Sequence, residues 1–180
     1  MNACAINTTG MYCWGVGDTG ELGNGSTGTT NEFPTKNLMT APTTMTMGYR
    51  YVCAANSSGM YCWGEGNNGQ LGNGSTIDQK EPVKSHMTNP AQMTSGGYHT
   101  CAVNTSGMYC WGRGAEGQIG NGSTGDTAYP TLNQMTNPTM ITAGDHYTCA
   151  TNSSGMYCWG YGNNGQLGNG STVSTEFPTK

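Results

Sequence analysis

The hexapeptide Gly-Met-Tyr-Cys-Trp-Gly occurs four times without change, at residues 10–15, 59–64, 107–112 and 155–160. Met and Cys alternate with Tyr and Trp along it. An extended chain would therefore carry Met and Cys on one face and the two aromatic rings on the other. The segment predicts a β-strand, present in four copies.

A second cysteine precedes each of these strands at a constant distance. In the first copy the segment between the cysteines centres on Asn-Thr-Thr-Gly at residues 7–10, a four-residue turn in which glycine is free to take a positive φ. Folding there brings Ile6 opposite Met11, and Cys4 opposite Cys13. The pattern predicts a disulfide across each antiparallel hairpin. The predicted pairs are Cys4 with Cys13, Cys53 with Cys62, Cys101 with Cys110, and Cys149 with Cys158.

Zinc ligation and free thiols are the alternatives for these cysteines. Structural zinc sites favour about two to four residues between ligands and need four ligands, which suits a β-hairpin poorly. Disulfides place the chain outside the reducing cytosol, in an extracellular or cell-surface setting. In the chain-entropy model each ten-residue loop closed in this way is worth roughly 2.5 kcal/mol.

Aligned on Cys4, Cys53, Cys101 and Cys149, the chain repeats with a period of about 48 residues. A fixed period of this length is typical of propellers and solenoids, in which each unit buries its apolar face against its neighbours. We expect one repeat array over residues 1–180, divided approximately into 1–49, 50–97, 98–145 and a truncated 146–180.

The rest of the repeat completes a small β unit. A glycine-rich loop surrounds one apolar residue, which we expect to be buried: Leu22, Leu71, Ile119 or Leu167. A later proline marks a short outer or edge strand, where a missing N–H is tolerated: Pro34, Pro82, Pro130 or Pro178. A Met-Thr segment, such as residues 135–148, then leads into the next cysteine strand. The unit holds three or four short strands and no helix.

The composition agrees with an all-β chain and excludes several classes of function. Only 34% of the residues are hydrophobic and 9% are charged, while glycine reaches 30 of 180, which disfavours a helical bundle. A net charge of −4 offers no footprint for nucleic acid. No apolar run approaches the roughly 20 residues of a membrane helix, so we expect no membrane insertion.

Trp-Gly, followed by Gly-Gln-Leu-Gly-Asn-Gly, a later proline, and Gly-Gly-Tyr-His-Thr-Cys-Ala-Val at residues 96–103, resembles the repeats of the regulator of chromosome condensation family. The resemblance implies four-stranded blades of a propeller that closes with seven blades in that family. Only His99 matches the histidine of the family's blade, since Tyr51 and Tyr147 stand at its position. The paired cysteines are more similar to secreted bacterial members than to the nuclear exchange factor.

Nothing in the chain predicts an enzyme, a cofactor or a metal site. Gly15-x-Gly17-x-x-Gly20 spells a dinucleotide-binding fingerprint, but the pattern recurs in every repeat with no helix to follow, so turn geometry explains it. The three histidines, His86, His99 and His146, stand at unrelated phases and do not form a set.

Eight Asn-x-Ser/Thr sequons make glycosylation a prediction. Four lie at the expected hairpin tips, at Asn7, Asn56, Asn104 and Asn152. Four lie in the glycine loops, at Asn24, Asn73, Asn121 and Asn169. The tips should be modified first because they leave room for a bulky group.

Two functions fit these features. The near identity of the repeats favours a non-enzymatic extracellular structural protein, a glycosylated fibre or surface-layer component, because binding proteins usually diversify their loops. The alternative is a recognition propeller that binds a protein or a glycan through its loop face. The candidate binding surface is then the position that varies after each conserved strand: Val16, Glu65, Arg113 and Tyr161.

The first repeat lacks the Met-Thr segment that precedes Cys53, Cys101 and Cys149, so we expect its blade to be incomplete. Unpaired edges and apolar faces invite pairing with another chain. We therefore expect other copies of the chain as head-to-tail partners, forming a ring if the rotation closes and a filament if it does not.

Overall fold

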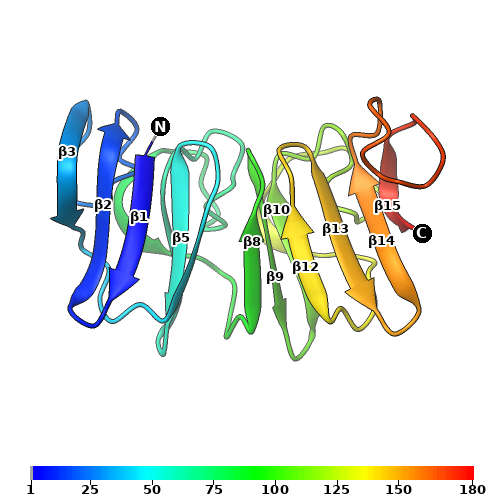
Figure 1. Cartoon of the computed structure of the whole chain (residues 1–180), viewed down its shortest axis with the longest axis horizontal. Helices are drawn as coiled ribbons and strands as arrows, with labels where there is room; N and C mark the ends of the chain where they lie inside the picture. Colours follow the sequence, from blue (N-terminus) through cyan, green and yellow to red (C-terminus); the bar gives the residue numbers. More distant parts are fainter. Residues whose placement is uncertain (1) are drawn as a thin grey trace.

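The computed structural model describes residues 2–180, which form fifteen β-strands without any helix, and so contain no helix that could cross a membrane. The strands make four antiparallel sheets, here called the first to fourth blades. They stand side by side in chain order, from β3 at one side of Figure 1 to β15 at the other. The predicted all-β array of repeated hairpins is confirmed.

The first blade contains β1 (Asn2–Asn7), β2 (Gly10–Gly17) and β3 (Thr29–Lys36). The second contains β4 (Thr44–Met47), β5 (Tyr51–Asn56), β6 (Gly59–Gly64) and β7 (Gln79–Lys84). The third contains β8 (Gln92–Ser95), β9 (His99–Asn104), β10 (Gly107–Gly112) and β11 (Thr127–Leu132). The fourth contains β12 (Met140–Ala143), β13 (Tyr147–Asn152), β14 (Gly155–Gly160) and β15 (Thr175–Thr179).

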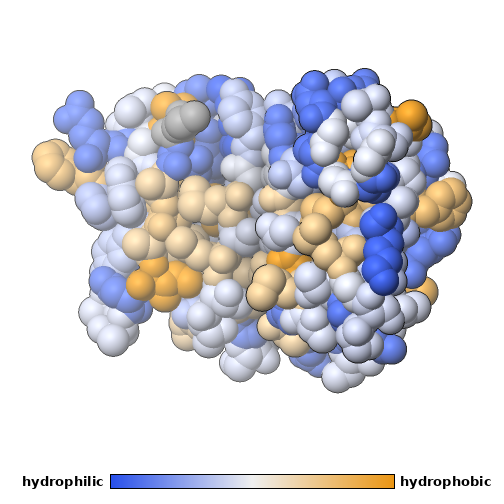
Figure 2. Space-filling model, turned by 45° about the vertical axis from the view of Figure 1, so that its right-hand side comes forward, coloured by the Kyte–Doolittle hydropathy of each residue, from blue (hydrophilic) through white to orange (hydrophobic). Residues whose placement is uncertain are grey.

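Each complete blade runs from an inner strand, supplied by the Met-Thr segment, through the cysteine hairpin to an outer proline strand. The inner strand β8 contacts both β4 and β12, so the blades converge along one side of the molecule. On that side Figure 2 shows hydrophobic colour gathered across the middle of the surface. The first blade has three strands because the equivalent of β4 is missing from it. Each complete blade therefore begins one strand earlier than the predicted repeat, because the Met-Thr segment at the end of one predicted repeat forms the inner strand of the next blade. The boundaries of the sequence repeats remain a prediction.

The hairpin register confirms the four predicted disulfides. Cys4 is opposite Cys13, and Ile6 is opposite Met11, across the turn between β1 and β2. Gly10 adopts a φ of +141°, a conformation that glycine allows at the exit of the turn. The same register joins Cys53 to Cys62, Cys101 to Cys110, and Cys149 to Cys158. In every blade the two cysteines are bonded with a Cα–Cα distance of 4.1 Å, and these staples indicate a non-reducing environment.

The apolar core lies between neighbouring blades. Met11, Cys13 and Leu22 of the first blade pack with Val52, Ala54 and Trp63 of the second. Equivalent residues form the cores between the second and third blades and between the third and fourth. The alternation of the repeated hexapeptide explains this arrangement, because its Met and Cys face the following blade and its aromatic rings face the preceding one.

The apolar residue of each glycine loop, Leu22, Leu71, Ile119 or Leu167, is buried as predicted. Trp63, Trp111 and Trp159 are fully buried, whereas Trp14 is only half-buried, because among the described residues no blade packs against its side of the first blade. The tryptophans are therefore packing residues wherever a preceding blade is present.

Candidate binding surface at the loop ends of the blades

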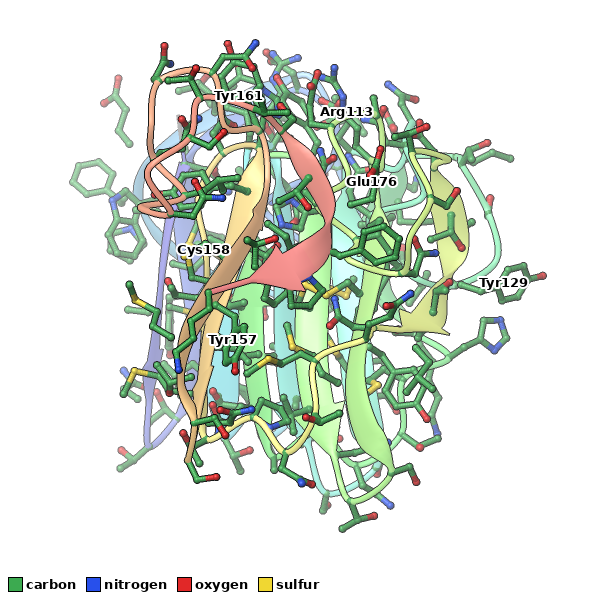
Figure 3. The ribbon with its side chains drawn as sticks, turned by 90° about the vertical axis from the view of Figure 1, so that its right-hand side faces the viewer. Arg113, Tyr129, Tyr157, Cys158, Tyr161 and Glu176 are labelled. Carbon is green, nitrogen blue, oxygen red and sulfur yellow. A yellow bond between two sulfur atoms is a disulfide. The ribbon has the colours of Figure 1, made fainter. Side chains whose placement is uncertain are left out.

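The glycine loops and the turns that lead into the cysteine strands lie at one end of the blades, which we call the loop face. The hairpin tips lie at the opposite end, at the bottom of Figure 1. The predicted residues Glu65, Arg113 and Tyr161 lie on the loop face, directly after β6, β10 and β14. Arg113 and Tyr161 project from this end in Figure 3.

A second set of unlike residues, which the sequence analysis missed, lies beside the first. The amide of Glu65 donates a hydrogen bond of 2.8 Å to the carbonyl of Arg50. In the same way Arg113 donates to Tyr98, and Tyr161 to His146, each over 2.9 Å. Arg50, Tyr98 and His146 each stand three residues before a cysteine, so comparison of the three turns could have revealed them.

Aromatic rings from successive turns form a row across the loop face. The ring centroids of Tyr49 and Tyr98 are 5.7 Å apart. Tyr98 and His146 are stacked at 5.7 Å, and His146 meets Tyr161 edge-on at 6.4 Å. These separations are typical of favourable aromatic pairs. The row therefore joins residues of three blades into one surface.

Two arginines lie over this row. The Arg50 guanidinium lies 5.9 Å from the centre of the Tyr49 ring, and that of Arg113 lies 5.9 Å from the Tyr98 ring. Arg50 also pairs with Asp18 at 3.1 Å, and Arg113 with Glu116 at 3.9 Å. Such partly exposed pairs contribute little to stability. They keep the two guanidinium groups close to the rings.

Acidic groups border the row. Burial, and next the charge of Asp78, raises the pKa of Glu65. Burial, and next the charge of Asp145, raises the pKa of Tyr98. The surface therefore places aromatic rings and guanidinium groups beside carboxylates. It contains both donors and acceptors of hydrogen bonds.

An open hollow of about 740 Å³ adjoins the row where the inner strands converge. Its lining includes Val16, Asp18, Tyr49, Arg50 and Asp145. Val16, the fourth predicted residue, thus borders the hollow but lies outside the aromatic row. The floor is fixed by backbone bonds, because the amide of Tyr49 donates to Gly97 and the amide of Gly97 to Asp145.

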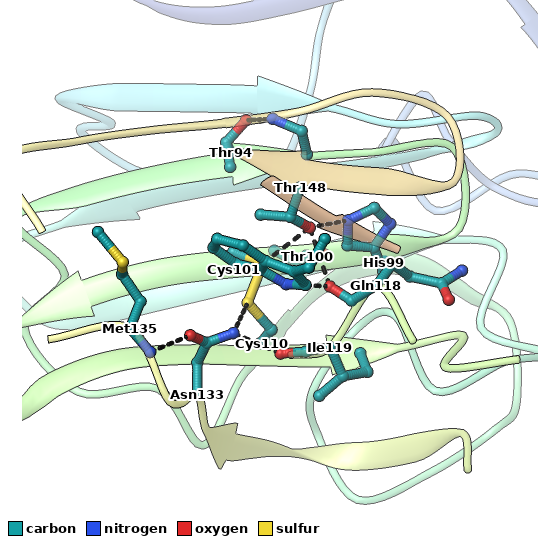
Figure 4. The surroundings of a disulfide bond; sticks show 12 residues. Thr94, His99, Thr100, Cys101, Cys110, Gln118, Ile119, Asn133, Met135 and Thr148 are labelled. Atoms are coloured by element: carbon teal, nitrogen blue, oxygen red, sulfur yellow. Dashed lines mark hydrogen bonds between the residues drawn. A yellow bond between two sulfur atoms is a disulfide. The ribbon is translucent and has the colours of Figure 1, made fainter. Parts of the chain in front are cut away.

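The three histidines lie in different parts of the blades. His86 is exposed and lies against Tyr129, and His146 belongs to the aromatic row. His99 is fully buried with its Nε2 2.8 Å from the Thr148 hydroxyl, near the Cys101–Cys110 disulfide in Figure 4. Burial, and next the charge of His146, lowers the pKa of His99 to about 3, so it is neutral at physiological pH. Within residues 2–180 no group of three or more His, Cys, Asp or Glu side chains could hold a metal ion.

The sequon asparagines differ in their contacts. The Nδ2 groups of Asn56, Asn104 and Asn152 donate to the carbonyls of Thr40, Thr88 and Thr136. Asn7 has no such bond among the described residues, because the first blade lacks the preceding Met-Thr segment. Its Oδ1 accepts from the amide and the hydroxyl of Thr9.

Four small sheets that pack face to face with a period of about 48 residues define a propeller-type repeat protein. The family model described as the regulator of chromosome condensation (RCC1) repeat matches residues 58–103, 107–151 and 154–180, and a second RCC1 repeat model matches residues 91–118. The chain therefore belongs to the RCC1 repeat family. No curated protein gives a significant match.

Solved structures with the same fold include yeast RCC1 (Prp20) bound to Kap60, with a TM-score of 0.85 and 20% identity over 99% of this chain and 46% of that chain. Human WBSCR16 has a TM-score of 0.86 and 22% identity, over 98% of this chain and 50% of that one. A structure of Prp20p from Saccharomyces cerevisiae, described with its binding to Gsp1p and histones, has a TM-score of 0.82 and 20% identity over 99% and 48%. The chain spans about half the length of these structures, and at such identities the likeness shows the fold alone.

Proposed function

We propose that the chain is a non-enzymatic recognition module that binds a protein partner through its loop face. The observation that carries the proposal is the convergence of unlike residues from nearly identical repeats. Glu65, Arg113 and Tyr161 lie beside Arg50, Tyr98 and His146, as their backbone hydrogen bonds require. The hexapeptide strand that precedes Glu65, Arg113 and Tyr161 is the same in every repeat, whereas these three residues differ from one another.

A protein partner fits the chemistry of this surface best. Tyrosine and arginine dominate binding energy at protein interfaces, and Tyr49 keeps 51% of its surface exposed. The paired carboxylates supply the polar rim that such interfaces use. Prp20, a member of the same repeat family, is described with the protein partners Kap60, Gsp1p and histones, which supports the class of partner but not its identity.

A displayed peptide library, screened beside a glycan array, would test this proposal. We expect peptides that bind the unchanged chain, and that weaken at least about tenfold on a loop-face variant with Tyr49→Ala, Tyr98→Ala and Tyr161→Ala. A matched variant of the exposed hairpin tips, Ser58→Ala, Thr105→Ala and Ser154→Ala, should bind the same peptides unchanged. Binding of glycans alone, or equal binding by both variants, would refute the proposal.

The second candidate is a structural role, as a glycosylated subunit of an extracellular or cell-surface fibre. The observation that favours it is the four disulfides, which indicate a non-reducing environment. Imaging of native material tests this role directly. We expect filaments or rings composed of the repeat, and material that is uniformly monomeric would count against it.

A further inference from the structure

We propose that the loop face binds a protein segment rich in lysine and arginine, whose cationic side chains lie against the tyrosine rings and pair with Glu65 and Asp145. The inference rests on the proposed function, since it names the chemistry of the partner for the same surface. The groups that carry it belong to the second, third and fourth blades, which pack against one another within this chain.

The acidic residues are distributed unevenly over the molecule. The chain has ten acidic and six basic residues. Seven of the acidic residues lie on the loop face, in the glycine loops, in the turns that lead into the cysteine strands, or directly after a hexapeptide strand: Asp18, Glu21, Glu65, Asp78, Glu116, Asp126 and Asp145. The other three lie in outer strands, at Glu32, Glu81 and Glu176.

The basic residues have a different distribution. On the loop face there are two, Arg50 and Arg113, and Arg113 is seen at that end in Figure 3. Three of the four lysines lie at the hairpin tips, 2.9 to 3.2 Å from a Cβ built on the glycine of the turn: Lys36, Lys84 and Lys180. The loop face is therefore negative and the opposite end of the blades is positive. Such a separation of charge orients a charged partner before contact.

The two arginines form their ion pairs with carboxylates other than Glu65 and Asp145. Arg50 pairs with Asp18, and Arg113 pairs with Glu116. Asp145 lies 3.5 Å from His146, and its side chain keeps 69% of its surface exposed. This carboxylate is therefore accessible to a cationic side chain of a partner.

The excess of negative charge acts on the aromatic row itself. Burial is the main cause of the raised pKa of Glu65, and the charge of Asp78 adds more to it than the charge of Arg50 removes. The pKa of Tyr98 is raised by burial and then by the charges of Asp145 and Glu65. Like charges thus outweigh the arginines at both groups, so a cation brought by a partner would be attracted to them.

The chain itself shows how this surface holds a cation. The guanidinium of Arg113 lies 5.9 Å from the centre of the Tyr98 ring and 3.9 Å from the carboxylate of Glu116. Arg50 lies in the same way between a tyrosine ring and a carboxylate. A cation over a tyrosine ring is a favourable arrangement, and the carboxylate adds a charge contact. A lysine or arginine of a partner can make the same two contacts.

A cationic segment fits the exposed groups better than an anionic one. Tyr49 keeps 51% of its surface exposed, and tyrosine rings bind both peptides and cations. An acidic or phosphate-bearing partner would instead place its charges against Glu65 and Asp145, and such contacts between like charges are unfavourable. The charges of the loop face therefore favour a basic segment of a protein.

Peptides from the displayed library, sorted by net charge, test the inference. We expect the peptides that bind the unchanged chain to be enriched in lysine and arginine, and their affinity to fall on the order of tenfold from about 0.05 M to about 0.5 M sodium chloride. A variant with Glu65→Gln and Asp145→Asn keeps the size of both side chains and removes their charge. It should bind these peptides about fivefold more weakly.

The matched control carries Glu32→Gln and Glu81→Gln, which remove the same charge from exposed positions of the outer strands. It should change the affinity by less than about twofold. Selected peptides that are neutral or acidic, an affinity that does not depend on salt, or equal losses in both variants would overturn the inference. Misfolding of a variant cannot produce the salt dependence, because that is measured on the unchanged chain. Peptides that bind regardless of charge but weaken on the tyrosine variant would leave the proposed function standing, so the two proposals can fail separately.

Discussion

The second and fourth glycine loops have one sequence and two environments. In residues 66–76 the loop is covered by the third blade, and Gly72 lies against Trp111 and Ser85. In residues 162–172 the equivalent Gly168 adopts the same backbone, with φ of +68° against +65°, but has no neighbour within 4 Å among the described residues. The comparison separates two requirements for glycine at this position. The positive φ is a property of the loop itself, whereas the lack of room for a side chain is caused by the neighbouring blade.

The largest difference should come from the tryptophans at the two kinds of interface. Trp111→Ala removes a fully buried ring and its bond to Gln70, and should lower the free energy of unfolding by about 3–5 kcal/mol. Trp14→Ala should cost under about 1 kcal/mol in the monomer, because the ring is already partly exposed. Urea denaturation at low protein concentration measures both, and equal losses would contradict the division into covered and open ends.

Substitution of Gly72 and Gly168 should change the free energy of unfolding less than substitution of Trp111. Gly168→Ala should lose about 1 kcal/mol through its positive φ alone. Gly72→Ala carries the same strain and in addition forces the Trp111 ring away, so we expect a further loss of about 1–3 kcal/mol. The same denaturation experiment gives the difference between the two variants, which isolates the contribution of the neighbouring blade.

The buried His99 gives the third blade a pH dependence that its tyrosine counterparts lack. Its pKa is about 3 in the folded chain and about 6.5 when unfolded, so the unfolded state binds more protons between these values. Stability should therefore fall as the pH falls below about 6.5, by about 2 kcal/mol between pH 7 and pH 5. His99→Tyr, which restores the residue found at Tyr51 and Tyr147, should remove this part of the loss. Equal losses in both proteins at pH 5 would show that His99 is not responsible.

The hairpin tips differ in a way that denaturation would not detect. Asn7 should carry N-linked sugar at higher occupancy than Asn56, Asn104 or Asn152. The Nδ2 that accepts the sugar is engaged by a carbonyl in those three and by none of the described residues in Asn7. Glycopeptide analysis of natively produced protein measures the occupancy at each site. Uniform occupancy at the four tips would show that this hydrogen bond does not limit modification.

Much of the fold could be predicted because its determinants are local. The spacing from Cys4 to Cys13 predicts a hairpin whose four-residue turn, residues 7–10, sets the cross-strand register and hence the disulfide. The prolines correctly predicted the outer strands, because only an edge strand tolerates a residue that has no backbone N–H to donate. The buried position of Leu71 follows from one apolar residue within a polar, glycine-rich loop.

The candidate surface could be predicted only in part. Glu65, Arg113 and Tyr161 stand out because they interrupt a conserved block, whereas Arg50, Tyr98 and His146 lie in turns whose sequences vary more widely. That these two sets adjoin depends on hydrogen bonds between the two ends of each cysteine hairpin. The aromatic row depends in addition on how neighbouring blades are placed, which no single repeat encodes.

By itself the sequence determined the period, the strands, the hairpin pairing and the disulfides, because each depends on residues close together in the chain. Tertiary structure alone decided that Trp63 reaches the carbonyl of Glu21, and that identical loops are covered or open among the described residues. The physical reason is that each of these contacts joins residues about 40 or more positions apart. Whether such a contact forms depends on the presence of a neighbouring blade, which the sequence of one repeat does not specify.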